Sequence, residues 1–333
     1  MSQNNDTTSR STLSMSDLNR TKKTSLKLAA HLKTLHERTG DQRYLSQATR
    51  VHYCSTFWQG FYCEKCGKFH HMHTTGCRHR LCPTCAVRAS RVVAVQAMEA
   101  LEHIRIVLPD ISCSLLTLTQ RNVPGESLNG EIDAVLKAWQ ALRHLRPFGR
   151  HVLGWARTIE IIPALDGRGY HPHIHAIIIH RNLGPLSHPG WWSQSWRECM
   201  KLDYNPIVDI RPIEEERGAI YEVSKYISKM SRIYVGGERE LENVQWIGDA
   251  MHQRQLRTYG GCWLKARRVL NQLRVEQLSD DELSEYGEAL DTRGACVDCE
   301  TPLKAVCLSW AGLTYVFDDG VPASGLKVGD LRD

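Results

Sequence analysis

The stretch Tyr170-His171-Pro172-His173-Ile174-His175-Ala176-Ile177-Ile178-Ile179 alternates imidazole side chains with small or apolar ones and then becomes wholly apolar. Alternation with a period of two is typical of a β-strand, so the three histidines are predicted to share one face. Adjacent imidazoles are poor core residues, but they are good ligands for a divalent metal or a phosphate. The stretch therefore predicts a sheet that carries a functional site.

The segments around it predict a mixed fold. Their order of strand, helix, strand, strand, strand, helix is typical of an α+β protein, with an antiparallel, ferredoxin- or RRM-like sheet flanked by helices. A turn-like Asp166–Gly169 predicts a hairpin between the second and third strands. The predicted strands are 113–119, 152–163, 170–180 and 207–213, and the predicted helices are 26–40, 91–107, a helix from about 129, and 214–232.

The composition narrows the class of protein. The 333 residues contain no run of eighteen apolar residues and no apolar signal-peptide core, so we expect a cytoplasmic protein without a membrane partner. Twelve cysteines in such a protein favour bound metal or buried thiols over disulfides. Residues 1–50 carry nine Lys and Arg against four Asp and Glu, whereas 276–333 carry four against thirteen. A basic body with an acidic tail suits a phosphate-rich partner.

Two Cys-x-x-Cys knuckles, Cys63–Cys66 and Cys82–Cys85, lie fifteen residues apart. This spacing predicts one structural Zn²⁺ held by these four thiolates, with no open position for catalysis. Cys77 is the first possible substitute, and Cys54, His70, His71, His73 and His79 also compete. Cys296 and Cys299, with Cys307 beyond them, form a further candidate group that lacks an obvious fourth ligand.

Oxygen ligands are needed beside the histidines if the ion is Mg²⁺ or Mn²⁺. If the hairpin forms, Glu160 lies on the neighbouring strand, within reach of His173 or His175. A predicted helix then places Glu222 and Tyr226 one turn apart on one face, with Lys229 nearby. A cation favours the phenolate of such a tyrosine, and a glutamate one turn away can activate water. Tyr221 is predicted to pack.

These residues resemble the rolling-circle plasmid replication initiators (Rep proteins) of the HUH endonuclease superfamily, in its single-tyrosine branch. The resemblance covers about residues 51–265. It rests on the following pieces: Leu116–Thr119, Tyr170–His175, Lys225-Tyr226, Cys77-Arg-His-Arg-Leu-Cys82-Pro-Thr-Cys85, Trp139, Leu202-Asp203-Tyr204 and Ala219–Val223.

The resemblance implies that His173 and His175, with Glu160, hold Mg²⁺ or Mn²⁺. Tyr226 would nick plasmid origin DNA, single-stranded or in a cruciform, to form a 5′-phosphotyrosine and a 3′-OH primer. Glu222 would activate water in termination. His171, Lys225 and Lys229 would be accessory. A host helicase and DNA polymerase would be partners, and the cell would be bacterial.

With this resemblance the chain divides into five consecutive parts. We expect a polar, basic, partly disordered leader at 1–50, a zinc module at 51–90, an HUH nickase domain at 91–235, a basic DNA-contacting extension at 236–275 and an acidic tail at 276–333. Phosphate contacts in the extension are assigned by charge to Arg254, Arg257, Lys265, Arg267 and Arg268.

Three other functions compete. An HUH transposase of an insertion sequence shares the cysteine-rich start and the His-hydrophobic-His pair, but position 222 is Glu where many transposases have a second Tyr. A histidine-triad nucleotide hydrolase fits the alternation from His171 to Ile177 loosely, and it has no use for Tyr226. A non-catalytic zinc-finger DNA-binding regulator would leave the histidine face idle.

Overall fold

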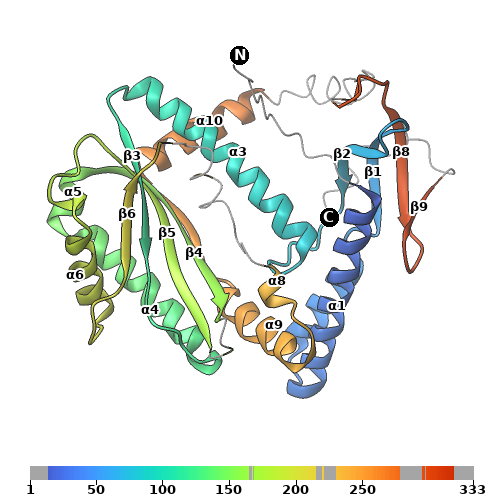
Figure 1. Cartoon of the computed structure of the whole chain (residues 1–333), viewed down its shortest axis with the longest axis horizontal. Helices are drawn as coiled ribbons and strands as arrows, with labels where there is room; N and C mark the ends of the chain where they lie inside the picture. Colours follow the sequence, from blue (N-terminus) through green and yellow to red (C-terminus); the bar gives the residue numbers. More distant parts are fainter. Residues whose placement is uncertain are drawn as a thin grey trace, which may run out of the picture. The chain divides into compact units, whose positions relative to one another are not determined.

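The computed structural model describes residues 14–164, 167, 169–214, 220, 230–277, 295–296 and 298–318. The chain forms two compact units, one of Met1–Thr84 with Gln277–Asp333 and the other of Cys85–Glu276. This division differs from the five consecutive parts expected from the sequence, because a strand near the C-terminus pairs with a strand near the N-terminus. Each unit is described by itself (Figure 1).

The first unit begins with a helix that starts earlier than predicted. Ser14 accepts a hydrogen bond from the backbone N–H of Asp17, and the Asp17 carboxylate accepts one from the backbone N–H of Ser14, which together form a capping box. The helix ends at Gly40 (φ +73°), as its sequence predicts. Much of the expected leader is therefore helical. The elements are α1 (Met15–Thr39), α2 (Gln42–His52), β1 (Phe57–Cys63), β2 (Lys68–Thr74), β8 (Lys304–Trp310) and β9 (Tyr315–Phe317).

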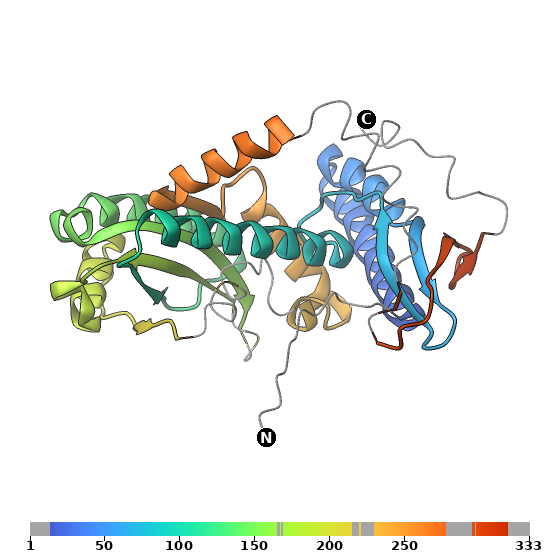
Figure 2. The same ribbon diagram turned by 90° about the horizontal axis from the view of Figure 1, so that it is seen from above.

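The strands of the first unit form an antiparallel sheet in the order β2-β1-β8-β9. Figure 2 shows α1 and α2 side by side next to this sheet. Burial of apolar side chains drives this packing. The core consists of Leu18 of α1 with Trp58, Phe69, Leu308 and Tyr315 of the strands. Part of the expected acidic tail is thus built into the sheet.

The second unit is an α+β fold with a five-stranded antiparallel sheet in the order β6-β3-β5-β4-β7. The predicted fold class is therefore confirmed. Its elements are α3 (Pro83–Val107), β3 (Ser112–Leu118), α4 (Gly125–His144), α5 (Arg146–His151), β4 (Val152–Pro163), β5 (Tyr170–His180), η1 (Gly184–Ser187), α6 (Pro189–Met200), β6 (Val208–Pro212), α8 (Met230–Ile233), α9 (Gly237–Met251), β7 (Arg257–Gly261) and α10 (Cys262–Gln277).

Helices cover both faces of this sheet. On one face, apolar residues of α3 and α10 form a core with Leu115, Ile177 and Ile179. On the other face, Trp139 of α4 packs edge-on against Trp155, with ring centroids 5.3 Å apart. The expected basic extension is an integral part of this unit, since β7 pairs with β4 and α10 contributes to the core. Within the described part of the chain, no helix is both long and apolar enough to span a membrane.

Candidate functional site

The hairpin of β4 and β5 brings the predicted metal ligands together. In its register, Glu160 lies opposite His173, and Thr158 lies opposite His175. Directly opposed residues of an antiparallel pair point to the same face. These side chains therefore share the face that α3 and α10 cover further along the strands.

Two imidazole nitrogens converge on one carboxylate oxygen. Nε2 of His173 lies 2.9 Å from Oε2 of Glu160, and Nε2 of His175 lies 3.4 Å from the same oxygen. Glu160 and His173 are buried, whereas His175 is half-buried. The side chains thus offer two nitrogens and an oxygen, a donor set that suits a divalent cation.

The other ring nitrogens fix the orientation of the two imidazoles. Nδ1 of His173 lies 3.2 Å from the carbonyl oxygen of His171, which can only accept, so this Nδ1 carries a proton and donates it. Nε2 of His173 then faces the Glu160 carboxylate. Nδ1 of His175 lies 3.2 Å from Oγ1 of Thr117. Such outer contacts are typical of histidines that bind metals.

Electrostatics favour an anionic glutamate here. Burial alone would raise the pKa of Glu160, but the hydrogen bonds from His173 and His175 outweigh burial and hold this pKa well below its usual range. Burial, together with the nearby His173, lowers the pKa of His171. Nδ1 of His171 contacts Oδ1 of Asn122 at 3.1 Å, and His171 is not part of the converging group.

The two threonines beside His175 were not predicted as site residues. Thr117 belongs to the Leu116–Thr119 motif. The alternation of Leu and Thr in this motif is the signal that could have placed Thr117 on one face of the sheet. Thr158 is fully buried, and its Oγ1 has no hydrogen-bond partner among the described residues. Buried hydroxyls are normally hydrogen-bonded, so Thr158 has an unused polar atom beside the Glu-His-His group.

Tyr226, Glu222, Lys225 and Lys229 lie outside the described residues, so their predicted roles stay predictions. Ile220, six residues before Tyr226, is buried in the core beneath α3. Ile233 of α8, seven residues after Tyr226, is also buried.

The cysteines form two clusters instead of one. Cys82 and Cys85 group with Cys54 and Cys77, whereas Cys63 and Cys66 group with Cys296 and Cys299. The predicted sharing of one ion by Cys63, Cys66, Cys82 and Cys85 is therefore wrong. Cys63 and Cys66 are held at the β1–β2 turn, where the chain after residue 294 supplies the other two thiols. Cys77, the predicted substitute, is a member of the first cluster.

A buried lysine, Lys22, binds the backbone beside Cys54 of the first cluster. Nζ of Lys22 donates to the carbonyl oxygens of His52 and Cys54, at 2.8 and 2.6 Å. Burial lowers the pKa of Lys22, and the neighbouring thiol groups offset this effect in part. Sγ of Cys54 and Sγ of Cys82 lie 3.7 Å apart, close to the about 3.8 Å expected between two thiolates on one tetrahedral Zn²⁺.

The five predicted DNA-contacting residues lie in different environments. Arg254 is paired with Asp133 at 2.7 Å, and Arg267 lies over the Tyr259 ring at 3.9 Å. Lys265 and Arg268 of α10 are exposed, and Arg257 is half-buried. Charge alone did not distinguish these environments. We therefore leave Arg254 out of the proposed DNA contacts.

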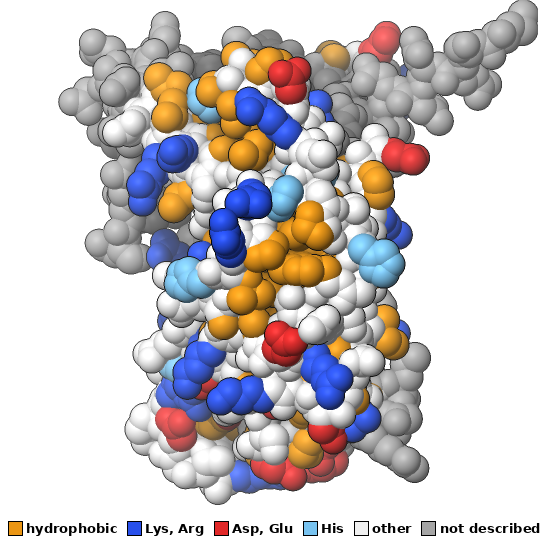
Figure 3. Space-filling model, turned by 90° about the vertical axis from the view of Figure 1, so that its left-hand side faces the viewer, with side chains coloured by type: hydrophobic (Ala, Val, Ile, Leu, Met, Phe, Trp, Pro, Cys, Tyr) orange, Lys and Arg blue, Asp and Glu red, His pale blue; other side chains and the backbone are white. Residues whose placement is uncertain are grey.

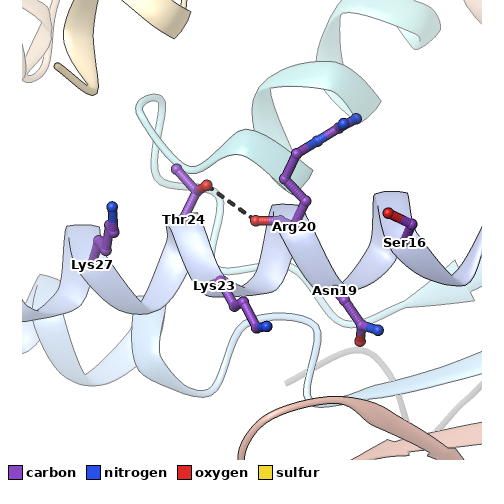
Figure 4. Close-up of a pocket in the computed structure, with 6 residues that line it drawn as sticks. All are labelled: Ser16, Asn19, Arg20, Lys23, Thr24 and Lys27. Carbon is purple, nitrogen blue, oxygen red and sulfur yellow. Dashed lines mark hydrogen bonds between the residues drawn. The ribbon is translucent and has the colours of Figure 1, made fainter.

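Basic side chains are found on the face that Figure 3 shows. On the face seen from the side of α5 and α6, Lys and Arg surround hydrophobic side chains, and Asp and Glu gather toward the bottom (Figure 3). A separate hollow beside α1 is lined partly by basic side chains (Figure 4). Its lining residues are Ser16, Asn19, Arg20, Lys23, Thr24 and Lys27.

The fold and the site define an α+β protein with a Glu-His-His group on the face of an antiparallel sheet. A family model described as "Replication protein", Rep_1, matches residues 68–298. The chain belongs to this family of replication proteins. The resemblance to rolling-circle plasmid replication initiators, which the motifs indicate, is thereby confirmed.

Curated relatives agree with the family. The chain is 29% identical over 274 residues to a "Protein rep" of Bacillus amyloliquefaciens, covering 73% of this chain and 79% of the relative. It is 28% identical to a "Protein rep" of a Bacillus species, covering 73% and 87%. Identity to a "Protein rep" of Streptococcus pneumoniae serotype 2 is 29%, covering 60% and 65%. No solved structure matches the chain.

Proposed function

We propose that this replication protein initiates rolling-circle replication by nicking plasmid origin DNA through a covalent 5′-phosphotyrosine. The observation that carries the proposal is the convergence of His173 Nε2 and His175 Nε2 on Oε2 of Glu160. Such a group is suited to hold a divalent cation beside a phosphodiester.

Glu160, His173 and His175 would hold Mg²⁺ or Mn²⁺. The bound ion would supply positive charge that polarises the scissile phosphate. Glu160, kept anionic, contributes the hard oxygen that these ions prefer. Thr117 holds the His175 ring in place through Nδ1, so that Nε2 stays directed at the ion site.

Tyr226 is the proposed nucleophile. Its phenolic oxygen gives up its proton to water and bonds to the phosphorus, the bond from phosphorus to the 3′ oxygen breaks, and that oxygen takes a proton from water to become the primer 3′-OH. Ile220 supports this assignment, because it anchors the chain six residues earlier on the sheet face that carries the ligands.

A nicking enzyme of this kind would also bind origin DNA, host replication proteins and a structural metal ion. Exposed Lys265 and Arg268 of α10, with Arg257 and Arg267, would contact the phosphates of origin DNA. A host helicase and DNA polymerase would extend the primer. Cys54, Cys77, Cys82 and Cys85 would hold a structural Zn²⁺, for which four thiolates are a complete set.

The test is covalent capture of labelled single-stranded origin DNA. With Mn²⁺ present, wild-type protein is expected to give a denaturant-resistant adduct, and Tyr226→Phe is expected to give none. Tyr221→Phe is the matched control, since it removes a hydroxyl from the same predicted helix and should keep the adduct. His173→Ala should lose most of it.

The same assay separates the proposed roles. Glu222→Ala should still form the adduct but release it slowly, because the base that activates water is missing. An undiminished adduct with Tyr226→Phe would contradict the proposal. Nucleotide hydrolysis that depends on His173 but not on Tyr226 would indicate a histidine-triad hydrolase instead.

A further inference from the structure

The second cysteine cluster joins residues that are far apart in the sequence. Cys63 and Cys66 lie at the end of β1 and in the turn that follows, and Cys296 and Cys299 lie shortly before β8. Sγ of Cys63 is 3.3 Å from Sγ of Cys299, and Sγ of Cys66 is 3.6 Å from Sγ of Cys296. All four sulfurs lie within 4.8 Å of one another. Thiolates on one tetrahedral Zn²⁺, with bonds of about 2.3 Å, would be about 3.8 Å apart.

The two knuckles have the same kind of backbone turn. The N–H of Gly67 donates to the carbonyl oxygen of Cys63 at 2.9 Å, and the N–H of Glu300 donates to that of Cys296 at 2.8 Å. Gly67 has φ +68° and Glu300 has φ +56°. A positive φ is uncommon for a residue such as glutamate. Its use at the matching position indicates that both turns are shaped to direct two sulfurs at one point.

Polar contacts hold the two knuckles together around the sulfurs. Nζ of Lys68 pairs with Asp298 at 2.8 Å, which joins the first residue of β2 to the second knuckle. Nζ of Lys304 pairs with Glu64 at 3.0 Å, which joins β8 to the first knuckle. Four thiolates exceed the charge of one Zn²⁺ by two, and Lys68 provides nearby positive charge. All four cysteines are free thiols.

We propose that Cys63, Cys66, Cys296 and Cys299 bind a second zinc ion, which fastens the chain after Gln277 to the N-terminal part of the first unit. The family match at residues 68–298 leaves out Cys63, Cys66 and Cys299, so this site is read from the structure of this chain. The ion closes a unit that is interrupted in the sequence by all of Cys85–Glu276. It thereby holds β8 in register beside β1.

The first test is the zinc content of the full-length protein, purified under reducing conditions and measured by atomic emission against protein concentration. Wild type is expected to hold two ions per chain. The Cys296→Ser/Cys299→Ser double variant should hold one, and Cys54→Ser/Cys82→Ser should lose the other. Cys307→Ser is the matched control, because Cys307 is a buried thiol of β8 outside both clusters, and it should hold two.

A second measurement reports the metal ligands directly, in case a variant folds poorly. Cobalt substitution of wild type should give thiolate-to-cobalt absorption for two four-thiolate sites, and the Cys296→Ser/Cys299→Ser variant should lose half of it. A zinc content that Cys296→Ser/Cys299→Ser leaves unchanged from wild type would overturn the proposal, whatever the first cluster holds. A Cys63–Cys299 disulfide, found by mass spectrometry in protein purified under the reducing conditions of the first test, would also overturn it. The result is independent of nicking, since zinc content is read without DNA.

Discussion

Arg254 is a basic residue whose charge is used inside the protein. Its Nε and Nη2 donate to the two carboxylate oxygens of Asp133 at 2.7 and 2.9 Å, and its Nη1 donates to Asn129 at 3.0 Å. We expect Arg254→Gln to lower the free energy of unfolding by about 1–3 kcal/mol, because a bidentate charged pair is lost. Urea denaturation measures this change. Exposed Arg268→Gln is the control and should change it by less than about 0.5 kcal/mol.

This pair also predicts a pH dependence. The hydrogen bond from Arg254 holds the pKa of Asp133 below its usual value. A carboxyl with a lowered folded-state pKa contributes stability above its unfolded pKa of about 3.9, and this contribution is lost as the pH falls toward the folded value. The stability difference between wild type and Arg254→Gln should therefore shrink below about pH 4. A constant difference down to acid pH would contradict the pairing.

Individual residues were predictable where a local pattern marked them. The alternation around His173 and His175 and the hairpin turn before them predicted Glu160 on the neighbouring strand, within reach of either histidine, and the register then places it opposite His173. Thr158 carried no such signal, because threonine is common in strands and only the register puts it opposite His175. The pairing of Arg254 with Asp133 could not be predicted, because the two residues lie 121 positions apart in the sequence.

At the scale of elements, the β4–β5 hairpin depends on Gly169. This glycine has φ +89°, and a Cβ added to it would collide with the backbone carbonyl oxygen of Val123. Val123 and Tyr170 exchange two backbone hydrogen bonds of 2.8 Å there. Gly169→Ala should lower the free energy of unfolding by about 2–4 kcal/mol, from backbone strain plus the clash. Thermal or urea unfolding measures it.

Gly167 is the matched control for this substitution. It also has a positive φ (+72°), but a Cβ there would meet nothing within 4 Å. Gly167→Ala should therefore cost only the strain, about 1–2 kcal/mol. Because β4 and β5 carry Glu160 and His173, Gly169→Ala should also weaken adduct formation. Equal losses of stability in the two variants would show that the contact with Val123 does not matter.

Helices and strands that a local sequence pattern marks were predicted better than the pairing of segments far apart in the sequence. The capping box at Ser14 and Asp17 is a local signal that would have set the start of α1 correctly. The pairing of β8 with β1 joins residues such as Leu308 and Trp58, and the pattern of one strand does not reveal its partner. For the same reason, two cysteine knuckles that look like one site in the sequence belong to two clusters.

At the scale of the whole molecule, the charge is divided between the units. The basic first fifty residues and the acidic residues after 276 belong mostly to one unit, so their charges offset each other there. The positive excess lies between residues 51 and 275, most of which form the unit with the Glu-His-His group. A DNA backbone is therefore expected to bind mainly to the second unit.

This distribution predicts how binding of single-stranded DNA responds to salt. Each phosphate contact contributes about −0.7 to the slope of log affinity against log salt concentration. Lys265→Gln/Arg268→Gln should make the slope shallower by about 1.4, because two exposed cations of α10 are removed. Lys23→Gln/Lys27→Gln in the hollow beside α1 should leave the slope unchanged. Fluorescence anisotropy over a salt series measures both slopes, and the reverse result would place the DNA on α1.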